Sequence, residues 1–259
     1  MNGAVNGAVK GAVKGAVRVR VLGIGMGPRH LTAEVVEALR GCDYAVAARK
    51  AEDDGLLEAR RAVCEAHGVE LVEVPDPERD RRDPKDYPGA VAAWHEARVA
   101  AYERVLAARG GTAAFLVWGD PSLYDSTVRI VERVAARGVV PVEYDVLPGV
   151  SAPQLLAARH RMVLHEVGRP VHVTTARRLA AAVAEGQENI VVMLGSEPRF
   201  DGLEDWSVWW GANLGTDAEE LLAGRVGEVL PGIVRARARA RRAAGWVMDV
   251  CLLRKDAAR

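Results

Sequence analysis

The stretch 114–127, which reads AFLVWGDPSLYDST, carries the clearest chemical signature in the chain. It sets a carboxylate, Asp120, and a phenol, Tyr124, just after the apolar run 115–118. The glycine and proline that flank Asp120 supply backbone freedom and remove a hydrogen-bond donor, so the run must end in a tight turn. Polar side chains on such a turn could bind a ligand or take part in acid–base chemistry.

The residues around this turn predict the elements that position it. The apolar run 115–118 is typical of a buried strand, and 128–137 has apolar residues on one helical face and arginines on the other. A strand, a polar turn and a helix together place the turn at the carboxyl end of the strands of an α/β sheet, where such folds bind ligands.

Two further turns of this kind lie at 23–30 (GIGMGPRH) and 148–152 (PGVSA). The first invites comparison with the dinucleotide fingerprint G-x-G-x-x-G, which motivates a dinucleotide-dependent oxidoreductase as an alternative. Here, however, Gly27 is followed at once by Pro28, and the third glycine of the fingerprint is missing. A turn at which another ligand approaches the backbone fits this spacing equally well.

Taken together and in this order, the three turns resemble the motifs of the tetrapyrrole methyltransferases, G-x-G-x-G before a Leu-Thr helix start, G-D-P-x-x-Y and P-G-[VIT]-[ST]-[SA]. The resemblance covers about 17–255. It implies two α/β domains with S-adenosylmethionine bound in the cleft between them, and a homodimer. We expect a tail at 1–16, an N-terminal α/β domain at 17–161 and a C-terminal α/β domain at 162–259.

Within the family, four stretches narrow the resemblance: GIGMGPRHLT at 23–32, VWGDPSLYDST at 117–127, WWGA at 209–212 and GWVMD at 245–249. They are similar to the branch that methylates C-1 of precorrin-5 in cobalamin biosynthesis and expels acetate, giving precorrin-6A and S-adenosylhomocysteine. Methylation of another precorrin position and a corrinoid carrier without activity remain alternatives.

The resemblance also implies roles for individual residues. The cofactor pocket is expected to contain Met26, Trp118, Gly119, Asp120, Leu123, Ser151, Ala152, Leu194 and Ala212. The expected catalytic residues are Asp120, Tyr124 and Asp125. Asp120 could instead cap its own turn, and Tyr124 could pack beneath the following helix.

The acceptor would carry many carboxylates, so its cleft should offer cationic side chains. The candidates near predicted strand ends are Arg29, Arg49, Lys50 and Arg177, each of which could also be a solvated surface charge. His30 and His95 could assist deacetylation, although a lone histidine is more often structural. The tryptophans 206, 209 and 210 are expected to pack the second domain and the cleft wall.

Composition excludes several other classes. The formal net charge is +0, so no overall field recruits nucleic acid or a membrane surface, and the arginine run 235–242 is expected to be a solvated helix. The three cysteines match no zinc spacing or disulfide framework, which predicts no metal and a cytoplasmic location. No apolar run approaches the ~20 residues of a membrane span.

The remaining periodicities give the order of elements. Strands are expected at 17–23, 44–48, 69–74, 115–118, 139–146, 171–174, 190–194, 208–210 and 246–254, and helices at 32–39, 56–67, 90–109, 128–137, 152–159, 218–222 and 233–243. The charged, proline-rich segment 75–88 is long enough to be a lid. Strands alternating with helices predict a parallel first sheet, and the second half should be mixed.

Overall fold

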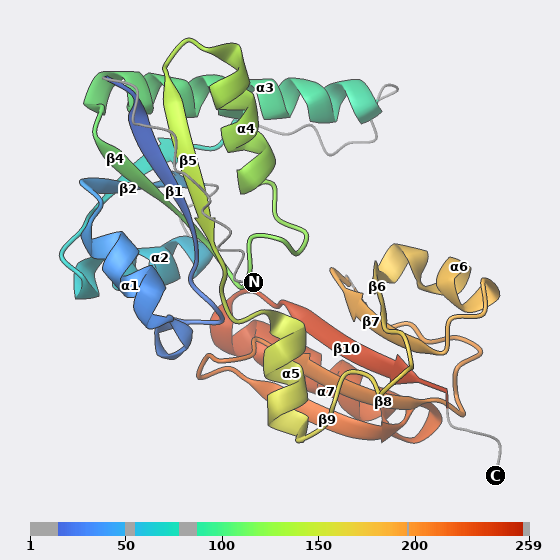
Figure 1. Cartoon of the computed structure of the whole chain (residues 1–259). Coiled ribbons are helices and arrows are strands. Elements are labelled where there is room, and N and C mark those ends of the chain that lie inside the picture. The colour runs from blue at the N-terminus through green and yellow to red at the C-terminus, as the bar shows by residue number, and fades with distance from the viewer. Residues whose placement is uncertain (1–14, 50–54, 78–86, 196, 256–259) are drawn as a thin grey trace, which may run out of the picture.

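The computed structural model describes residues 15–49, 55–77, 87–195 and 197–255. Most of the expected N-terminal tail, Lys50 and residues 78–86 of the expected lid lie outside the described residues. Two sheets with their helices are visible, one formed from the first half of the chain and the other from the second (Figure 1). This α/β architecture is the fold class expected from the sequence.

The first sheet is parallel, with strand order β3-β2-β4-β1-β5. Its strands are β1 (Val17–Gly23), β2 (Tyr44–Arg49), β3 (Glu70–Pro75), β4 (Thr112–Val117) and β5 (Val142–Leu147). Its helices are α1 (Ala33–Arg40), α2 (Gly55–Ala66), α3 (Tyr87–Arg109) and α4 (Thr127–Arg137), and a short 3-10 helix, η1 (Pro28–His30), precedes α1. The expected parallel arrangement is confirmed.

Successive side chains along the strands point to opposite faces of the first sheet, so the core of this half has two layers. Val19 and Val21 pack with the α3 and α4 side, whereas Leu22 packs with α1 and α2. Helices therefore cover both faces, as a parallel sheet requires. The Thr32 side chain caps α1 by accepting a hydrogen bond from the Val35 N–H (3.2 Å), as expected of a threonine at this position.

The second sheet is mixed, with strand order β6-β7-β10-β8-β9. Its strands are β6 (His172–Thr175), β7 (Asn189–Met193), β8 (Ser207–Ala212), β9 (Glu220–Arg225) and β10 (Asp249–Arg254). Its helices are α5 (Ala152–His160), α6 (Leu179–Ala184) and α7 (Val226–Ala244), with a 3-10 turn, η2 (Ala176–Arg178), before α6. Among the described strands of this sheet, only β6 and β7 pair in parallel, which confirms the expected antiparallel component.

Helix α5 connects the two halves. It follows the last strand of the first sheet, yet its residues Leu155 and Leu156 pack with Val250 and Leu252 of β10. The two sheets are thus joined through the turn at 148–151. The boundary expected between 161 and 162 stays a prediction, and the packing of α5 favours a junction nearer Pro148.

The prediction of a helix at 218–222 was wrong. Residues from Glu220 form β9, where Trp210 of β8 lies opposite Leu222. Leu221 and Leu222 pack into different cores on opposite faces of the sheet, which is the two-residue alternation of a strand. Helix α7 also begins at Val226 rather than Ile233, because packing against the second core carries the helix through Pro231.

No helix among the described residues is long and apolar enough to cross a membrane.

Candidate functional site

The three turns predicted to bind a ligand meet at the ends of β1, β4 and β5. Gly25 and Gly119 exchange backbone hydrogen bonds, with N···O distances of 2.7 and 3.2 Å. A Cβ on Gly23 would lie 2.5 Å from the backbone nitrogen of Gly149, and one on Gly149 would overlap the carbonyl of Gly119. Only glycine permits this contact between turns, which explains its recurrence in the motifs.

The side chain of Asp120 links two of these turns through hydrogen bonds. Its Oδ2 accepts a hydrogen bond from the Gly149 N–H (3.0 Å), and its Oδ1 accepts from both the N–H and the hydroxyl of Ser122. Burial opposes ionisation of Asp120, but these hydrogen bonds outweigh it and lower the pKa of the carboxyl below its ordinary value. The geometry supports the turn-capping role that the sequence left open.

A cavity of about 500 Å³ lies between the converging turns and the second sheet. Eight of the nine residues expected to form the cofactor pocket line it, namely Met26, Trp118, Gly119, Asp120, Leu123, Ser151, Ala152 and Leu194. Tyr124 and Asp125 line it too, and the second half of the chain contributes Met193, Gly195, Leu214 and 247–250. The sequence therefore located the cavity but named few of its residues from the second half.

The wall of this cavity combines apolar side chains with a few charges. Asp120, Asp125 and Asp249 contribute carboxylates, and Arg60 contributes a guanidinium. The Nε of Arg60 donates to the Leu116 carbonyl (2.8 Å) at the end of β4, where β2 no longer pairs. Sequence reasoning missed Arg60 because nothing in the sequence shows where β2 stops pairing with β4.

Residues with strained backbone conformations lie in the wall of the cavity and beside it. Among the described residues with side chains larger than glycine, four have a positive φ, and two of them, Tyr124 (φ 53°) and Leu194 (φ 56°), line the cavity. A third, Asn213 (φ 47°), is fully buried, and its Oδ1 accepts from the Met248 N–H (2.9 Å). Non-glycine residues in this conformation mark functional positions when the surrounding structure holds them there.

Two further contacts lie beside the cavity. Ser151 caps α5 in a capping box with Gln154, which sets the amino end of that helix beside the cavity. The indoles of Trp118 and Trp246 meet edge to face with ring centroids 6.2 Å apart. The buried Nε1 of Trp118 has no hydrogen-bond partner among the described residues.

A second cavity of about 500 Å³ adjoins the first and shares Tyr124 and Asp125 with it. Its other lining residues include Val128, Arg129 and Val146. Arg129 is exposed and has no hydrogen bond or ion pair with another described residue. The sequence did not single out Arg129, because its place on the solvent side of α4 looked like an ordinary surface charge.

Several expected site residues lie elsewhere. Ala212 is fully buried in β8 and does not line the cavity, because its side chain faces the second core. Arg29, Arg49 and Arg177 are exposed, and none of them lines a cavity described here, since closeness to a strand end does not fix the direction of a side chain.

The aromatic and imidazole candidates are also outside the cavity. Trp206 and Trp210 are buried in the second core, and Trp209 packs partly buried against α5, so all three pack the second half of the chain as expected. None of them lines the cavity beside the three turns, whose wall they were also expected to pack. His30 packs beside Gly215, and His95 lies on α3. Among the described residues, no group of three or more histidine, cysteine or acidic side chains could hold a metal ion.

The fold and these turns define a known class. A model of the family described as tetrapyrrole (corrin/porphyrin) methylases matches residues 18–230. The chain therefore belongs to the tetrapyrrole methylases. Over 251 residues it is 43% identical to a precorrin-6A synthase (deacetylating) of Sinorhizobium sp, with 93% of this chain and 96% of that protein covered.

Solved structures agree with this assignment. A putative cobalamin synthesis related protein (CobF) from Corynebacterium diphtheriae superposes with a TM-score of 0.80 and 34% identity, over 93% of this chain and 99% of that one. A uroporphyrin-III C-methyltransferase from Thermus thermophilus, complexed with S-adenosylhomocysteine, shares the fold with a TM-score of 0.54 and 20% identity, over 90% and 91% of the two chains.

Proposed function

We propose that this protein uses S-adenosylmethionine to methylate C-1 of precorrin-5 and removes an acetyl group as acetate, giving precorrin-6A. The observation that carries the proposal is the 43% identity to a precorrin-6A synthase (deacetylating) across nearly the whole of both chains. The geometry supports it, because the cavity beside the glycine turns adjoins a second cavity with room for part of an acceptor.

The residues present fit a bound S-adenosylmethionine. The cavity is apolar in most of its wall, and the carboxylates of Asp120 and Asp125 outnumber the guanidinium of Arg60, since the carboxylate of Asp249 is paired with Arg237. Such a wall suits a cationic donor. Main-chain groups of Gly119 and Leu194 would hold the donor together with the side chains of Met26 and Leu123.

The transfer asks little covalent chemistry of the protein. S-adenosylmethionine supplies a methyl group activated by a sulfonium, and an electron-rich ring carbon of the acceptor is the nucleophile. The chain must hold the donor and the acceptor in line and keep water from the donor, so positioning is the largest contribution. Tyr124 stands between the two cavities and would separate the two ligands.

Loss of the acetyl group needs a base. In this proposal Asp125 takes a proton from a water molecule that attacks the acetyl carbonyl carbon. The bond between that carbon and the macrocycle breaks, the electron pair stays on the ring, and acetate leaves. Asp125 borders both cavities, and among the described residues only its Oδ1 has a hydrogen-bond partner, the Thr127 N–H (2.6 Å).

The acceptor carboxylates need cations at the outer cavity. We infer that Arg129 is one of them, because it lines that cavity without another described partner. Arg29, Arg49, Lys50 and Arg177 stay predictions. The cytoplasmic location and the homodimer are likewise inferred from the family, and light scattering after size-exclusion chromatography tests the dimer.

Calorimetric titration with S-adenosylhomocysteine, with NADH as the control, tests the donor site. We expect micromolar binding of the first and no binding of the second. Turnover of precorrin-5 should then release acetate and S-adenosylhomocysteine in equal amounts. Binding of NADH alone would support the oxidoreductase, and methylation without acetate would indicate another precorrin position.

A further inference from the structure

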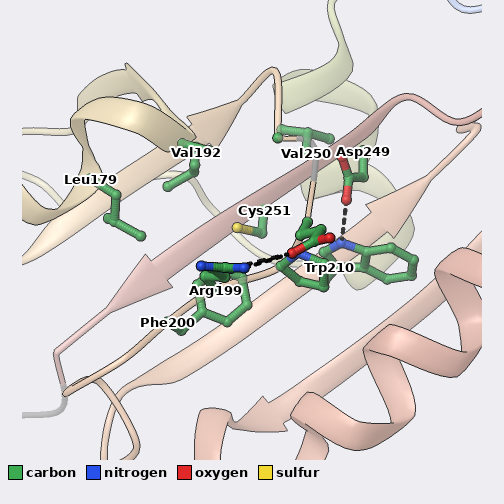
Figure 2. Close-up of a pocket in the computed structure, with 12 residues that line it drawn as sticks. Leu179, Val192, Arg199, Phe200, Trp210, Asp249, Val250 and Cys251 are labelled. Atoms are coloured by element: carbon green, nitrogen blue, oxygen red, sulfur yellow. Dashed lines mark hydrogen bonds and ion pairs between the residues drawn. The ribbon is translucent and has the colours of Figure 1, made fainter.

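Two cavities share one wall at the start of β10. Beside the large cavity lies a small one of about 20 Å³, which also includes Gly195, Asp249 and Val250 in its lining. Figure 2 shows the Asp249 carboxylate directed at the Trp210 indole, with Cys251 and Phe200 farther along the small cavity. The small cavity has room for about one water molecule, so it is not a ligand site. The contacts that hold the shared wall in place also affect the large cavity.

An arginine from the far side of the second sheet supports this wall. The Nε of Arg237, on α7, donates to Oδ2 of Asp249 over 3.0 Å, and the Trp210 Nε1 donates to the same oxygen over 3.3 Å. The side chains of Arg237 and Asp249 are only 13% and 8% exposed. The pair is therefore largely removed from water, unlike the other arginines of the same helix run.

The same guanidinium reaches the cavity-lining turn. The Nη2 of Arg237 donates to the carbonyl of Gly195 over 3.2 Å. The preceding residue, Leu194, has a φ of 56° and is 55% exposed at the wall of the large cavity. A leucine adopts this left-handed conformation only at a cost, so neighbouring contacts must hold it there.

We propose that Arg237 is a positioning residue for the donor site. By joining Asp249 to the Gly195 carbonyl, it holds Leu194 in the left-handed conformation that shapes the cavity wall. A buried ion pair is in general weak support for overall stability, because desolvation offsets the attraction. The contacts of Arg237 with both Asp249 and the Gly195 carbonyl, next to the strained Leu194, explain this ion pair better than a contribution to overall stability does. The proposal rests on the proposed function only in taking the large cavity as the donor site.

The first test compares two arginines of the same helix. Arg237→Gln should weaken S-adenosylhomocysteine binding by about tenfold, the effect of losing one charge-assisted hydrogen bond in a binding wall. The KM for the donor should rise similarly while kcat changes less than about twofold. The control is Arg239→Gln, which removes an exposed ion pair with Glu220 and should leave binding unchanged. Equal losses in the two variants would overturn the proposal.

A second set of variants asks whether the effect passes through Leu194. Leu194→Ala and Leu194→Gly both remove the side chain, but only glycine adopts a positive φ without strain. Arg237→Gln should therefore still weaken binding by about tenfold in the alanine background and by less than about twofold in the glycine background. The same loss in both backgrounds would show that Arg237 does not act on this turn.

The third measurement needs no ligand. Amide hydrogen exchange at Leu194 and Gly195 should be faster in Arg237→Gln than in the wild type or in Arg239→Gln. If Arg237→Gln does not fold, Arg237→Gln/Asp249→Asn removes both charges and is expected to give the same local exchange. Faster exchange with no S-adenosylhomocysteine binding by the wild type would contradict the proposed function alone. Unchanged exchange would contradict this inference alone.

Discussion

The N–H of Gly149 donates to the carboxylate of Asp120 over 3.0 Å, which joins the turn after β4 to the turn after β5. The same carboxylate accepts two hydrogen bonds from Ser122. Asp120 therefore belongs to the frame of the cavity, and its two oxygens already have partners within the protein. Asp120 thus has a structural role, whereas Asp125 borders both cavities and is the proposed base.

Asp120→Ala should destabilise the protein by about 1–2 kcal/mol and weaken S-adenosylhomocysteine binding, because Gly149 and Ser122 lose their acceptor. Asp120→Asn retains one acceptor oxygen and should lose less. Urea unfolding and calorimetric titration measure the two effects. Full affinity in Asp120→Ala would remove Asp120 from the donor site.

The pH dependence of stability should also reflect Asp120. Because its pKa in the folded state lies below the ordinary value, the carboxylate stabilises the fold above the unfolded-state pKa. That contribution is lost as the pH falls through the lowered folded-state pKa. Urea unfolding between about pH 6 and pH 3 should therefore show a smaller loss of stability for Asp120→Asn than for the wild type. Parallel pH profiles for the two proteins would contradict the assignment.

Gly149→Ala should be destabilising by at least about 2 kcal/mol, because the added methyl overlaps the Gly119 carbonyl and lies 2.6 Å from that of Gly23. The comparison is Gly41→Ala, where a Cβ would lie no closer than 3.5 Å to a neighbouring atom. Thermal unfolding and S-adenosylhomocysteine titration follow both variants. Equal stability of the two would mean that the turns are not packed as tightly as described.

Asp125→Asn should separate the two halves of the reaction. The asparagine oxygen can still accept from the Thr127 N–H and keep the start of α4, but it cannot take a proton from water. We expect S-adenosylhomocysteine formation within about threefold of the wild type and acetate release reduced by about 100-fold or more. Acetate release at the wild-type rate would exclude Asp125 as the base.

Arg129→Ala should raise the KM for the tetrapyrrole by about tenfold and leave S-adenosylhomocysteine affinity unchanged, since Arg129 lines only the outer of the two cavities. The matched control is Arg133→Ala, one turn farther along α4, which loses an exposed ion pair with Glu96. Similar KM values for both variants would place the acceptor carboxylates elsewhere.

The sequence predicted the site most accurately where backbone geometry restricts the residue type. Gly119 and Gly149 identify turns that approach each other closely, and the alternation of strands and helices gave the parallel sheet. The false helix at 218–222 arose because two adjacent leucines do not distinguish an edge strand from a helical turn until the partner strand is known. Ala212 was assigned from the motif alone, which does not say which face of β8 it occupies.

The charged residues were harder to predict. Arg60 reaches the end of β4 where β2 no longer pairs with that strand, and pairing between distant strands is not visible in the sequence. Arg237 gave a local signal, since it follows the buried Ala236 and lies four residues after the buried Ile233. Helical spacing therefore turns it inward from the arginine run, whereas Arg239 turns out toward Glu220.

The close glycine contacts have a consequence for the redesign of this protein. The turns that meet at Gly25, Gly119 and Gly149 are joined largely through main chain, so the donor half of the cavity tolerates few substitutions. The outer cavity is bounded by the side chains of Val128 and Arg129, which are free of such contacts. A library confined to the outer cavity should therefore change the preferred acceptor while the donor site stays intact.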